Sequence, residues 1–283
     1  GLVVLAFFLA FSRYGDLKLG DTDDEPEFSL HAWFAMLFAA GMGIGLVFFG
    51  VAEPVSHYST PPAGVTPNTP EAAHAAMRYT FFHWGLHPWA IYGVVGLAIA
   101  FFTFRRKSVP LVSTVTEALP WKIVGKLSPA FNVLAIVATA FGVAASLGVG
   151  ATQINGGLHA AFGIAVSPLN QAIIIVVTTV LFLTSAVTGV ERGVKWLSIG
   201  NLVLAGLLAL FVLVVGPTIA IIDTFTATLG AYLSELVRMS LRMTPFRDST
   251  WVGDWTVFYW AWWLAWSPFV GLFIARVSKG RTI

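Results

Sequence analysis

The sequence of 283 residues contains no cysteine and few charged residues. The absence of cysteine excludes disulfides, thiol catalysis and cysteine-ligated metals, but it says nothing about the cellular compartment. Asp, Glu, Lys and Arg together make up 11% of the chain, against about 25% in an ordinary soluble domain. This low share of charge excludes most soluble folds. The net charge of +2 comes from scattered Lys and Arg, so there is no basic stripe for nucleic acid.

Hydrophobic residues make up 57% of the chain and include 23 Phe and 11 Trp. With a mean hydropathy of +0.80, this apolar surface exceeds what one water-soluble core can bury, so we expect a lipid bilayer as solvent. A membrane-spanning helix needs roughly 20 apolar residues. Suitable stretches are 30 to 52, 81 to 104, 130 to 160, 170 to 189, 196 to 222 and 253 to 276, with a shorter one at 1 to 12. The sequence therefore predicts an all-α integral membrane protein, with residues 1–283 as a single transmembrane domain truncated at both ends.

The connections between these stretches carry Lys and Arg unevenly. If the connections alternate across the membrane, twelve Lys and Arg lie on one side and four on the other, and this bias marks the first side as cytoplasmic. We therefore expect a multi-pass protein of the plasma (inner) membrane. In the external connection after residue 222, apolar residues recur at helical spacing, which predicts an amphipathic surface helix at 223 to 243. Such a helix would act as an interfacial anchor or as a contact between subunits.

Two of the stretches contain residues that interrupt helices. Glycines occupy positions 41, 43 and 45 of the first long stretch, where backbone groups must otherwise stay bonded in lipid, and Glu53-Pro54 is expected to end that stretch. Ser267-Pro268 lies inside the last stretch and favours a kink or an unwound turn. Each feature alone is compatible with close helix packing through a GxxxG pair or with a simple proline kink. Together they are typical of inverted-repeat transporters, in which broken helices expose amides to an anion and carbonyls to a cation.

Aromatic residues are concentrated in two places. Six of the 11 Trp fall between residues 251 and 266. On a helix, an arc of roughly 120° holds Tyr259, Trp260, Trp263 and Trp266. A second group, around His87-Pro88, contains Trp84, Trp89 and Tyr92. The alternative explanation of these aromatic residues is a belt of Trp and Tyr at headgroup level. A helix, however, places Trp266 about 22 Å beyond Trp251, so the two cannot both lie at the same interface.

Rings at this depth suit a methylated cation. Aromatic faces attract cations by about 0.5 to 2 kcal/mol each, and quaternary ammonium groups are favoured ligands of such cages. A trimethylammonium group has no N–H to donate, and a buried carboxylate would incur a large desolvation cost. The spans offer no suitable acid, because Glu53 and Asp254 are expected at their ends. If the ligand also carries a carboxylate, the amides around Met42 and Gly43 are candidates to bind it.

At four places the sequence resembles the betaine/choline/carnitine transporter family, which shares the fold of sodium-coupled amino-acid symporters. The matching strings are FAAGMGIG at 38–45 followed by Glu53-Pro54, HWGLHPWAIY at 83–92, TAFG at 139–142 continuing to Gln153-Ile154, and WTVFYWAWW at 255–263 continuing to Ala275-Arg276. The resemblance covers essentially the whole chain. In these motifs the chain is most similar to sodium-coupled glycine betaine transporters.

The resemblance implies twelve spans, ten of which form two inverted five-helix repeats, and a homotrimer. This chain would hold the end of span two at 1–12, spans three to seven within 30–222, and span eight at 253–276. It would therefore be a fragment that lacks most of the second repeat. The substrate-binding residues that the resemblance implies are Trp84, Trp89, Tyr92, Trp260, Trp262, Trp263, Trp266 and, through its backbone, Met42.

The resemblance also implies sodium sites. In sodium-dependent relatives, one site combines two hydroxyl residues on span five with a phenyl ring on span eight. Thr139 and Phe269 match this pattern, but the second hydroxyl position is Val143, a departure that weakens the site. The other site would use carbonyls near Ala39 and Met42 together with hydroxyls from span ten.

These features lead to the hypothesis of sodium-coupled uptake of a quaternary ammonium compatible solute, glycine betaine first, by alternating access. Gly45, where proton-coupled choline relatives carry an acid, favours betaine and sodium. A sodium-independent exchanger and a proton-coupled choline or carnitine transporter are the alternatives. An ion channel would need a continuous polar pore. An enzyme would have to use His87 and Glu53 on different spans, a pair better explained by capping or loop bonding. We expect no enzyme activity and no cofactor besides the coupling ion.

Overall fold

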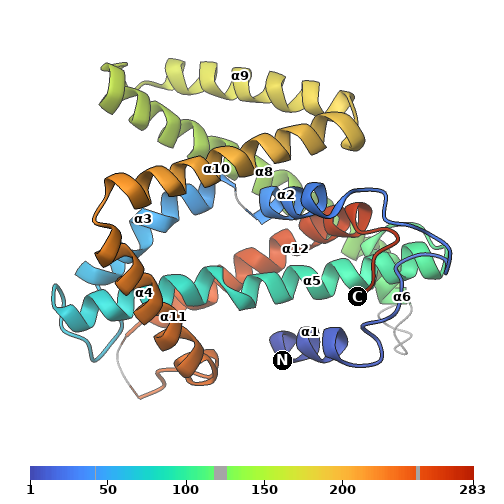
Figure 1. Ribbon diagram of the computed structural model, residues 1–283, viewed down its shortest axis with the longest axis horizontal. Helices are drawn as coiled ribbons and strands as arrows, with labels where there is room; N and C mark the ends of the chain where they lie inside the picture. Colours follow the sequence, from blue (N-terminus) through green and yellow to red (C-terminus); the bar gives the residue numbers. More distant parts are fainter. Residues whose placement is uncertain (42, 118–125, 247–248) are drawn as a thin grey trace.

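The computed structural model describes residues 1–41, 43–117, 126–246 and 249–283 (Figure 1). Helices dominate these ranges, and Lys18 and Thr282 form an isolated β-bridge. The α-helices are α1 Leu2–Phe11, α2 Leu30–Gly41, α3 Ile44–Ser59, α4 Pro70–Trp84, α5 Leu86–Ala100, α6 Val112–Glu117, α8 Ser128–Phe162, α9 Pro168–Val187, α10 Lys195–Val215, α11 Thr218–Ser240 and α12 Phe258–Val277. Short π-helical segments are η1 Phe101–Arg105, η2 Val190–Val194 and η3 Val252–Val257.

Within the described ranges, five helical segments are long and apolar enough to cross a bilayer, and the bent pair of α2 and α3 makes a sixth span. The five are Pro70–Arg105, Ser128–Phe162, Pro168–Val187, Val190–Val215 and Val252–Val277. The predicted all-helical membrane architecture is thus confirmed. The stretch 1 to 12 forms only the ten-residue helix α1. In Figure 1, α5 and α12 run side by side across the middle, whereas α9 lies at the outer edge.

The first long span is broken at its glycines, as the sequence predicts. Helix α2 ends at Gly41, α3 begins at Ile44, and the two helices are bent by 55° relative to each other. Gly43 lies between them with an extended backbone, and Met42 lies outside the described residues. A break of this kind leaves carbonyls at the end of α2 and amides at the start of α3 without helical partners.

Proline does not end the broken span. Helix α3 continues through Pro54 to Ser59, so the expectation that Glu53-Pro54 ends the span is wrong. A hydrogen bond between His57 Nε2 and Glu53 Oε1, at 3.0 Å, bridges the turn that contains the proline. Because these side chains are four residues apart, they lie on one face of the helix. This side-chain contact supports the turn where the proline removes a backbone donor.

Helix α12 also passes through its proline. It is continuous from Phe258 to Val277, so the structure has no unwound turn at Pro268. Because Pro268 has no backbone N–H, the carbonyl of Leu264, four residues earlier, has no helical hydrogen-bond donor. The Ser267 hydroxyl donates a hydrogen bond to this carbonyl at 2.8 Å. The freed acceptor is therefore satisfied within the helix, and the helix does not need to unwind.

The span Pro70–Arg105 is interrupted at Gly85, between α4 and α5. The Leu86 N–H donates to the Tyr232 hydroxyl on α11 at 2.9 Å. The His83 carbonyl accepts a hydrogen bond from Trp263 Nε1 on α12 at 3.1 Å. Side chains from two other helices thus satisfy backbone groups at the interruption, as the bilayer requires.

The end of α12 is fixed to the segment that precedes α2. Arg276 makes two hydrogen bonds to the Glu27 carboxylate, at 2.6 and 2.9 Å. Trp33 Nε1 donates to Ser278 Oγ at 3.0 Å, and the Arg281 guanidinium lies 4.3 Å from the Trp33 ring centroid. These hydrogen bonds from Arg276 lower the pKa of the Glu27 carboxyl below its ordinary value. The contacts hold the first and last spans together at one end.

We predict that Glu27→Gln lowers the melting temperature of the full-length protein at neutral pH. A partly exposed ion pair contributes no more than about 1 kcal/mol, which corresponds to about 2 °C. Because the folded pKa is lowered, the contribution is present above the ordinary carboxyl pKa of 4.5 and is lost as the pH falls below it. The difference between the two proteins should therefore shrink in acid. Glu25→Gln is the matched control, because the Glu25 carboxylate is exposed and forms no ion pair in the described part of the chain. Equal shifts of the melting temperature in both variants would contradict the prediction.

Candidate functional site

Aromatic side chains from α4, α5 and α12 meet in one cluster. We call it the aromatic box, and it consists of Trp84, Tyr92, Tyr259, Trp262 and Trp263. Trp84 and Tyr92 stand at 72° and 78° to the Trp263 ring, with centroid distances of 4.9 and 6.1 Å. Trp262 and Tyr259 stack on Trp263 at 5.0 and 5.7 Å. Aromatic faces at steep angles to one another can together contact a single methylated cation.

Glycines on neighbouring helices leave space for two further rings, those of Trp89 and Trp266. A Cβ atom at Gly41, at the end of α2, would overlap the Trp89 ring. A Cβ atom at Gly142, on α8, would overlap the Trp266 ring. Both positions therefore require the absence of a side chain, because an overlap of this kind forces the ring or the helix to move. The glycine at the helix break thus allows ring packing as well as the break.

The other predicted substrate residues lie at different places around the box. Trp89 is 40% exposed, and its ring centroid is 6.3 Å from that of Tyr92. Trp266 is on α12, as are three of the box residues, and it packs against α8. Trp260 packs against the cluster that contains the box, and its ring also stacks on His87 at 5.1 Å. Met42 lies outside the described residues. These assignments remain predictions.

Two of the predicted sodium residues, Thr139 and Phe269, lie within one turn of the contact between Gly142 on α8 and Trp266 on α12. Phe269 is one turn from Trp266, and the two ring centroids are 5.1 Å apart. Thr139 is half-buried on α8, one turn before the glycine that contacts Trp266, and Val143 is half-buried nearby. Ala39 lies in the last turn of α2, where carbonyls lose their helical partners. This assignment also remains a prediction.

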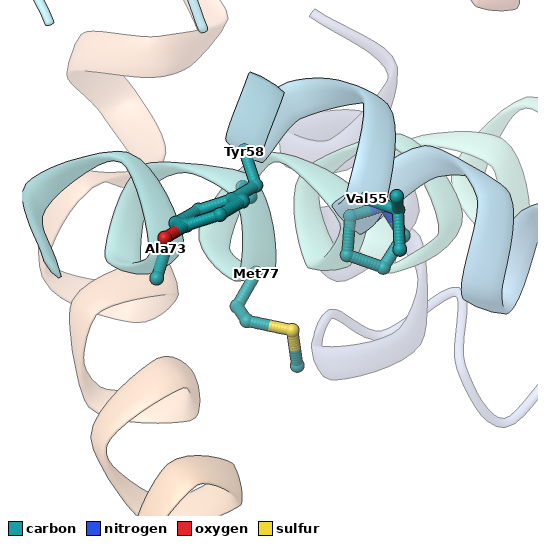
Figure 2. A pocket seen from close by; sticks show the side chains of 6 residues that line it. Val55, Tyr58, Ala73 and Met77 are labelled. Carbon is teal, nitrogen blue, oxygen red and sulfur yellow. The ribbon is translucent and has the colours of Figure 1, made fainter. Parts of the chain in front are cut away.

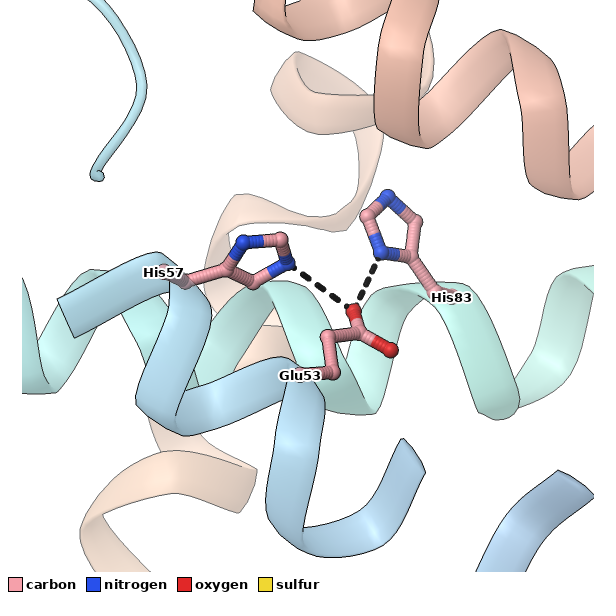
Figure 3. A group of neighbouring side chains, drawn as sticks. All are labelled: Glu53, His57 and His83. Atoms are coloured by element: carbon pink, nitrogen blue, oxygen red, sulfur yellow. Dashed lines mark hydrogen bonds and ion pairs between the residues drawn. The ribbon is translucent and has the colours of Figure 1, made fainter. Parts of the chain in front are cut away.

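A buried carboxylate lies next to the aromatic box. Glu53, His57 and His83 have fully buried side chains (Figure 3). Glu53 Oε1 is 3.0 Å from His57 Nε2 and 2.6 Å from His83 Nδ1. Glu53 Oε2 accepts hydrogen bonds from Trp84 Nε1 at 2.8 Å and from the Tyr259 hydroxyl at 2.6 Å. The carboxylate thus joins α3, α4 and α12.

This site corrects two expectations from the sequence, namely that Glu53 lies at a span end and that the spans offer no suitable acid. Glu53 is not at a span end, because α3 continues beyond the proline that follows it. It also does not pair with His87, whose Nε2 lies 2.9 Å from Ser240 Oγ on α11. The spacing of Glu53 and His57 was a usable signal, since residues four apart share one helix face. The sequence alone does not predict that His83, 30 residues away, contacts the same carboxylate.

The same three side chains have the chemistry of a metal-ligand set. Their Glu53 oxygen, His57 nitrogen and His83 nitrogen lie within 4.8 Å of one another. Two His and one Glu bind zinc in some enzymes. Here, however, four hydrogen bonds already satisfy the carboxylate, two at each oxygen. We therefore interpret the group as a hydrogen-bonded anion and not as a metal site.

An apolar pocket of about 220 Å³ lies between α3 and α4, away from the aromatic box (Figure 2). Its lining residues are Pro54, Val55, Tyr58, Ala73, Ala76 and Met77. Val55 and Tyr58 are exposed, so the pocket opens to the surface of the helices. It offers no charged group to a ligand.

We predict that Gly142→Ala destabilises the full-length protein, because overpacking against Trp266 costs about 1–3 kcal/mol. Gly148→Ala, on the same helix with open space around the added Cβ, should instead be neutral or stabilising, since alanine favours a helix over glycine by about 1 kcal/mol. Melting temperatures measure both effects. Trp266→Leu should reduce the cost of Gly142→Ala; a double mutant with additive losses would show that the two residues are not coupled.

Comparison with known proteins places the whole chain in one family. The model of the BCCT, or betaine/carnitine/choline, transporter family matches residues 1–283. The chain is 55% identical over 285 residues to the glycine betaine transporter OpuD of Bacillus subtilis, covering 99% of this chain and 56% of that protein. It is 47% identical to the ectoine/hydroxyectoine transporter of Virgibacillus pantothenticus, covering 99% and 56%, and 44% identical to a glycine betaine transporter of Acinetobacter baylyi, covering 100% and 43%.

The chain spans about half the length of the curated relatives that it matches. The family explains why the described residues form several membrane-spanning helices, and it confirms the expected plasma-membrane location and the expected absence of an enzyme class. The resemblance in the glycine, histidine and tryptophan motifs is confirmed as well. The chain belongs to the BCCT family of betaine/carnitine/choline transporters.

Proposed function

We propose that this chain forms the substrate-binding part of a secondary transporter for a trimethylammonium solute, with glycine betaine as the first candidate. The names of two relatives, which specify glycine betaine, support this substrate, and a third name specifies ectoine and hydroxyectoine. The observation that carries the proposal is the aromatic box at the junction of α4, α5 and α12. Because the chain spans about half of its relatives, the activity is proposed for the full-length protein.

The chemistry of the box favours a quaternary ammonium ion over other cations. Such an ion has no N–H donor and a diffuse charge, so aromatic faces satisfy it better than a hydrogen-bond acceptor does. A small hydrated cation would lose its water without gaining oxygen ligands. The carboxylate of a betaine would bind at amides of the broken span, near Met42 and Gly43. The two charges of the substrate would then be recognised by different parts of one site.

The broken span fits transport by alternating access in an inverted-repeat fold. The break between α2 and α3 lies inside a span, where such breaks are tolerated only next to protein or water. In transporters of this kind, broken helices present backbone groups to substrate and ion at the repeat interface. The spans in this chain would be the first repeat and the beginning of the second.

We predict that Trp263→Leu weakens glycine betaine binding by the full-length protein about 10- to 30-fold. The Trp263 ring contacts all four of the other rings of the box, and its Nε1 donates to the His83 carbonyl. Loss of this central ring removes up to about 2 kcal/mol of cation–π attraction. Binding of labelled glycine betaine to the purified protein measures the change.

Trp251→Leu is the matched control, because Trp251 is also a buried indole but belongs to a separate cluster with Tyr79 and Phe82, outside the box. We expect less than a threefold effect on affinity. An unchanged affinity in Trp263→Leu, with the protein folded and inserted, would contradict the proposed site. Equal losses in both variants would indicate a general packing defect.

We further propose sodium as the coupling ion. Thr139 and Phe269, within one turn of the contact between α8 and α12, and the carbonyls near Ala39 and Met42, are the candidate ligands. One sodium ion moving down a potential of 100 mV and a tenfold gradient releases about 2.3 plus 1.4 kcal/mol. One ion would then support roughly 500-fold accumulation of substrate and two ions roughly 10⁵-fold. Val143 in place of a hydroxyl residue would favour weaker ion binding at one site.

We predict that proteoliposomes containing the full-length protein accumulate labelled glycine betaine only with an inward sodium gradient. Thr139→Val should raise the sodium concentration needed for half-maximal uptake severalfold, and Val143→Ser should lower it, because each change removes or adds one hydroxyl ligand. Equal accumulation with and without the gradient would exclude sodium coupling. Uptake that depends on internal substrate would indicate an exchanger, and uptake driven by a pH gradient would indicate proton coupling.

The assembly that we propose is a homotrimer, with α11 as a contact. One side of α11 packs on α4, where Tyr232 is buried. The residues Phe225, Leu229, Leu233 and Val237 on the same helix are exposed. An exposed apolar face of this kind suits a neighbouring subunit or the membrane interface.

A further inference from the structure

The Glu53 carboxylate lies one hydrogen bond away from two rings of the aromatic box. Its Oε2 atom accepts from Trp84 Nε1 at 2.8 Å and from the Tyr259 hydroxyl at 2.6 Å. Both of these rings contact Trp263, at centroid distances of 4.9 and 5.7 Å. The carboxylate therefore lies beyond the N–H and O–H edges of these two rings, because both donors lie in the plane of their ring.

The hydrogen bonds indicate that the carboxylate is ionised. Trp84 Nε1 can only donate, and the Tyr259 hydroxyl donates as well, so Oε2 acts as an acceptor in both of its hydrogen bonds. At Oε1 the carboxylate faces His57 Nε2 and His83 Nδ1. An ionised carboxylate accepts at both oxygens, and this is the arrangement that satisfies every donor.

The neighbouring histidines fit the neutral state, so the negative charge is not cancelled. His57 Nδ1 is buried and has no hydrogen-bond partner among the described residues, which disfavours a proton there. His83 Nε2 lies 2.9 Å from Thr256 Oγ1, a hydroxyl that can donate to it. Within the described ranges no Lys or Arg forms an ion pair with Glu53. Arg242 does not reach this carboxylate, and its guanidinium donates to the Tyr79 hydroxyl at 2.8 Å.

A negative charge at this place strengthens the binding of a cation to the box. A ring that donates a hydrogen bond to an anion becomes more electron-rich, and the anion also attracts a cation held at the face of that ring through a medium of low dielectric constant. Direct contact is not needed. The cation keeps the aromatic contacts that a quaternary ammonium group prefers.

We propose that Glu53 is the buried counter-charge and a positioning residue of the aromatic box, acting on a quaternary ammonium substrate through Trp84 and Tyr259. The inference rests on the proposed function, since it concerns the substrate of the same site. It replaces the expectation that the rings act without an acid. It also explains selectivity, because a carboxylate covered by rings attracts a methylated ammonium group but offers no oxygen ligand to a small metal cation.

The test compares a cationic substrate with its uncharged-head isostere. In 3,3-dimethylbutanoate, a carbon atom replaces the ammonium nitrogen of glycine betaine, and the shape and the carboxylate are retained. Affinities of both compounds are measured by competition with labelled glycine betaine on the full-length protein. For Glu53→Gln we expect glycine betaine to bind about tenfold more weakly, and the isostere to change less than twofold or to bind more tightly. A merely structural role would weaken both compounds equally.

Two further variants keep the test decisive. Tyr259→Phe retains the ring but removes one hydrogen bond to the carboxylate, and it should weaken glycine betaine about threefold even if Glu53→Gln does not fold. Asp254→Asn is the control, because this exposed acid bonds to Thr250 outside the box, and it should change neither affinity.

The outcomes separate this inference from the proposed function. No binding of glycine betaine by the wild-type protein would overturn both. Normal binding by the wild type, together with an unchanged ratio of the two affinities in Glu53→Gln or an unchanged betaine affinity in Tyr259→Phe, would overturn the role of Glu53 alone.

Discussion

The structure depends on one constraint of the bilayer: a backbone group that a helix does not bond must find a partner inside the protein. At Gly85 the partners are side chains from α11 and α12, namely Tyr232 and Trp263. At Pro268 the partner is the neighbouring Ser267 hydroxyl. The indole of Trp263 therefore has two functions, because its N–H satisfies a freed carbonyl while its ring faces belong to the aromatic box.

A second consequence concerns charge. A carboxylate inside a membrane protein is costly unless several donors stabilise it. Glu53 has four such donors, from α3, α4 and α12. Two of them come from rings of the box, so the contacts that make the charge tolerable also fix the orientation of those rings. The second half of the broken span is thereby connected to α4 and α12, two of the three helices that carry the aromatic side chains of the box.

Much of this architecture could be predicted from local sequence. Runs of apolar residues indicate the spans, and the glycines at 41, 43 and 45 indicate the break between α2 and α3. The family resemblance implies that Trp84 and Trp263 belong to one site, and the structure brings their rings together. Helical periodicity places Trp260 on the same face as Trp263, but only the packing of α5 shows that the Trp260 ring also stacks on His87.

The buried acid was missed for a related reason. Proline next to Glu53 indicates a helix end, yet the hydrogen bond to His57 supports the turn, and the two partners from α4 lie some 30 residues away in sequence. The most direct test of the account is a structure of the full-length protein with bound glycine betaine. We expect the trimethylammonium group to lie against the faces of Trp84, Tyr92 and Trp263, with Glu53 at the N–H edge of Trp84. An ammonium group in direct contact with a carboxylate, or bound away from these rings, would contradict it.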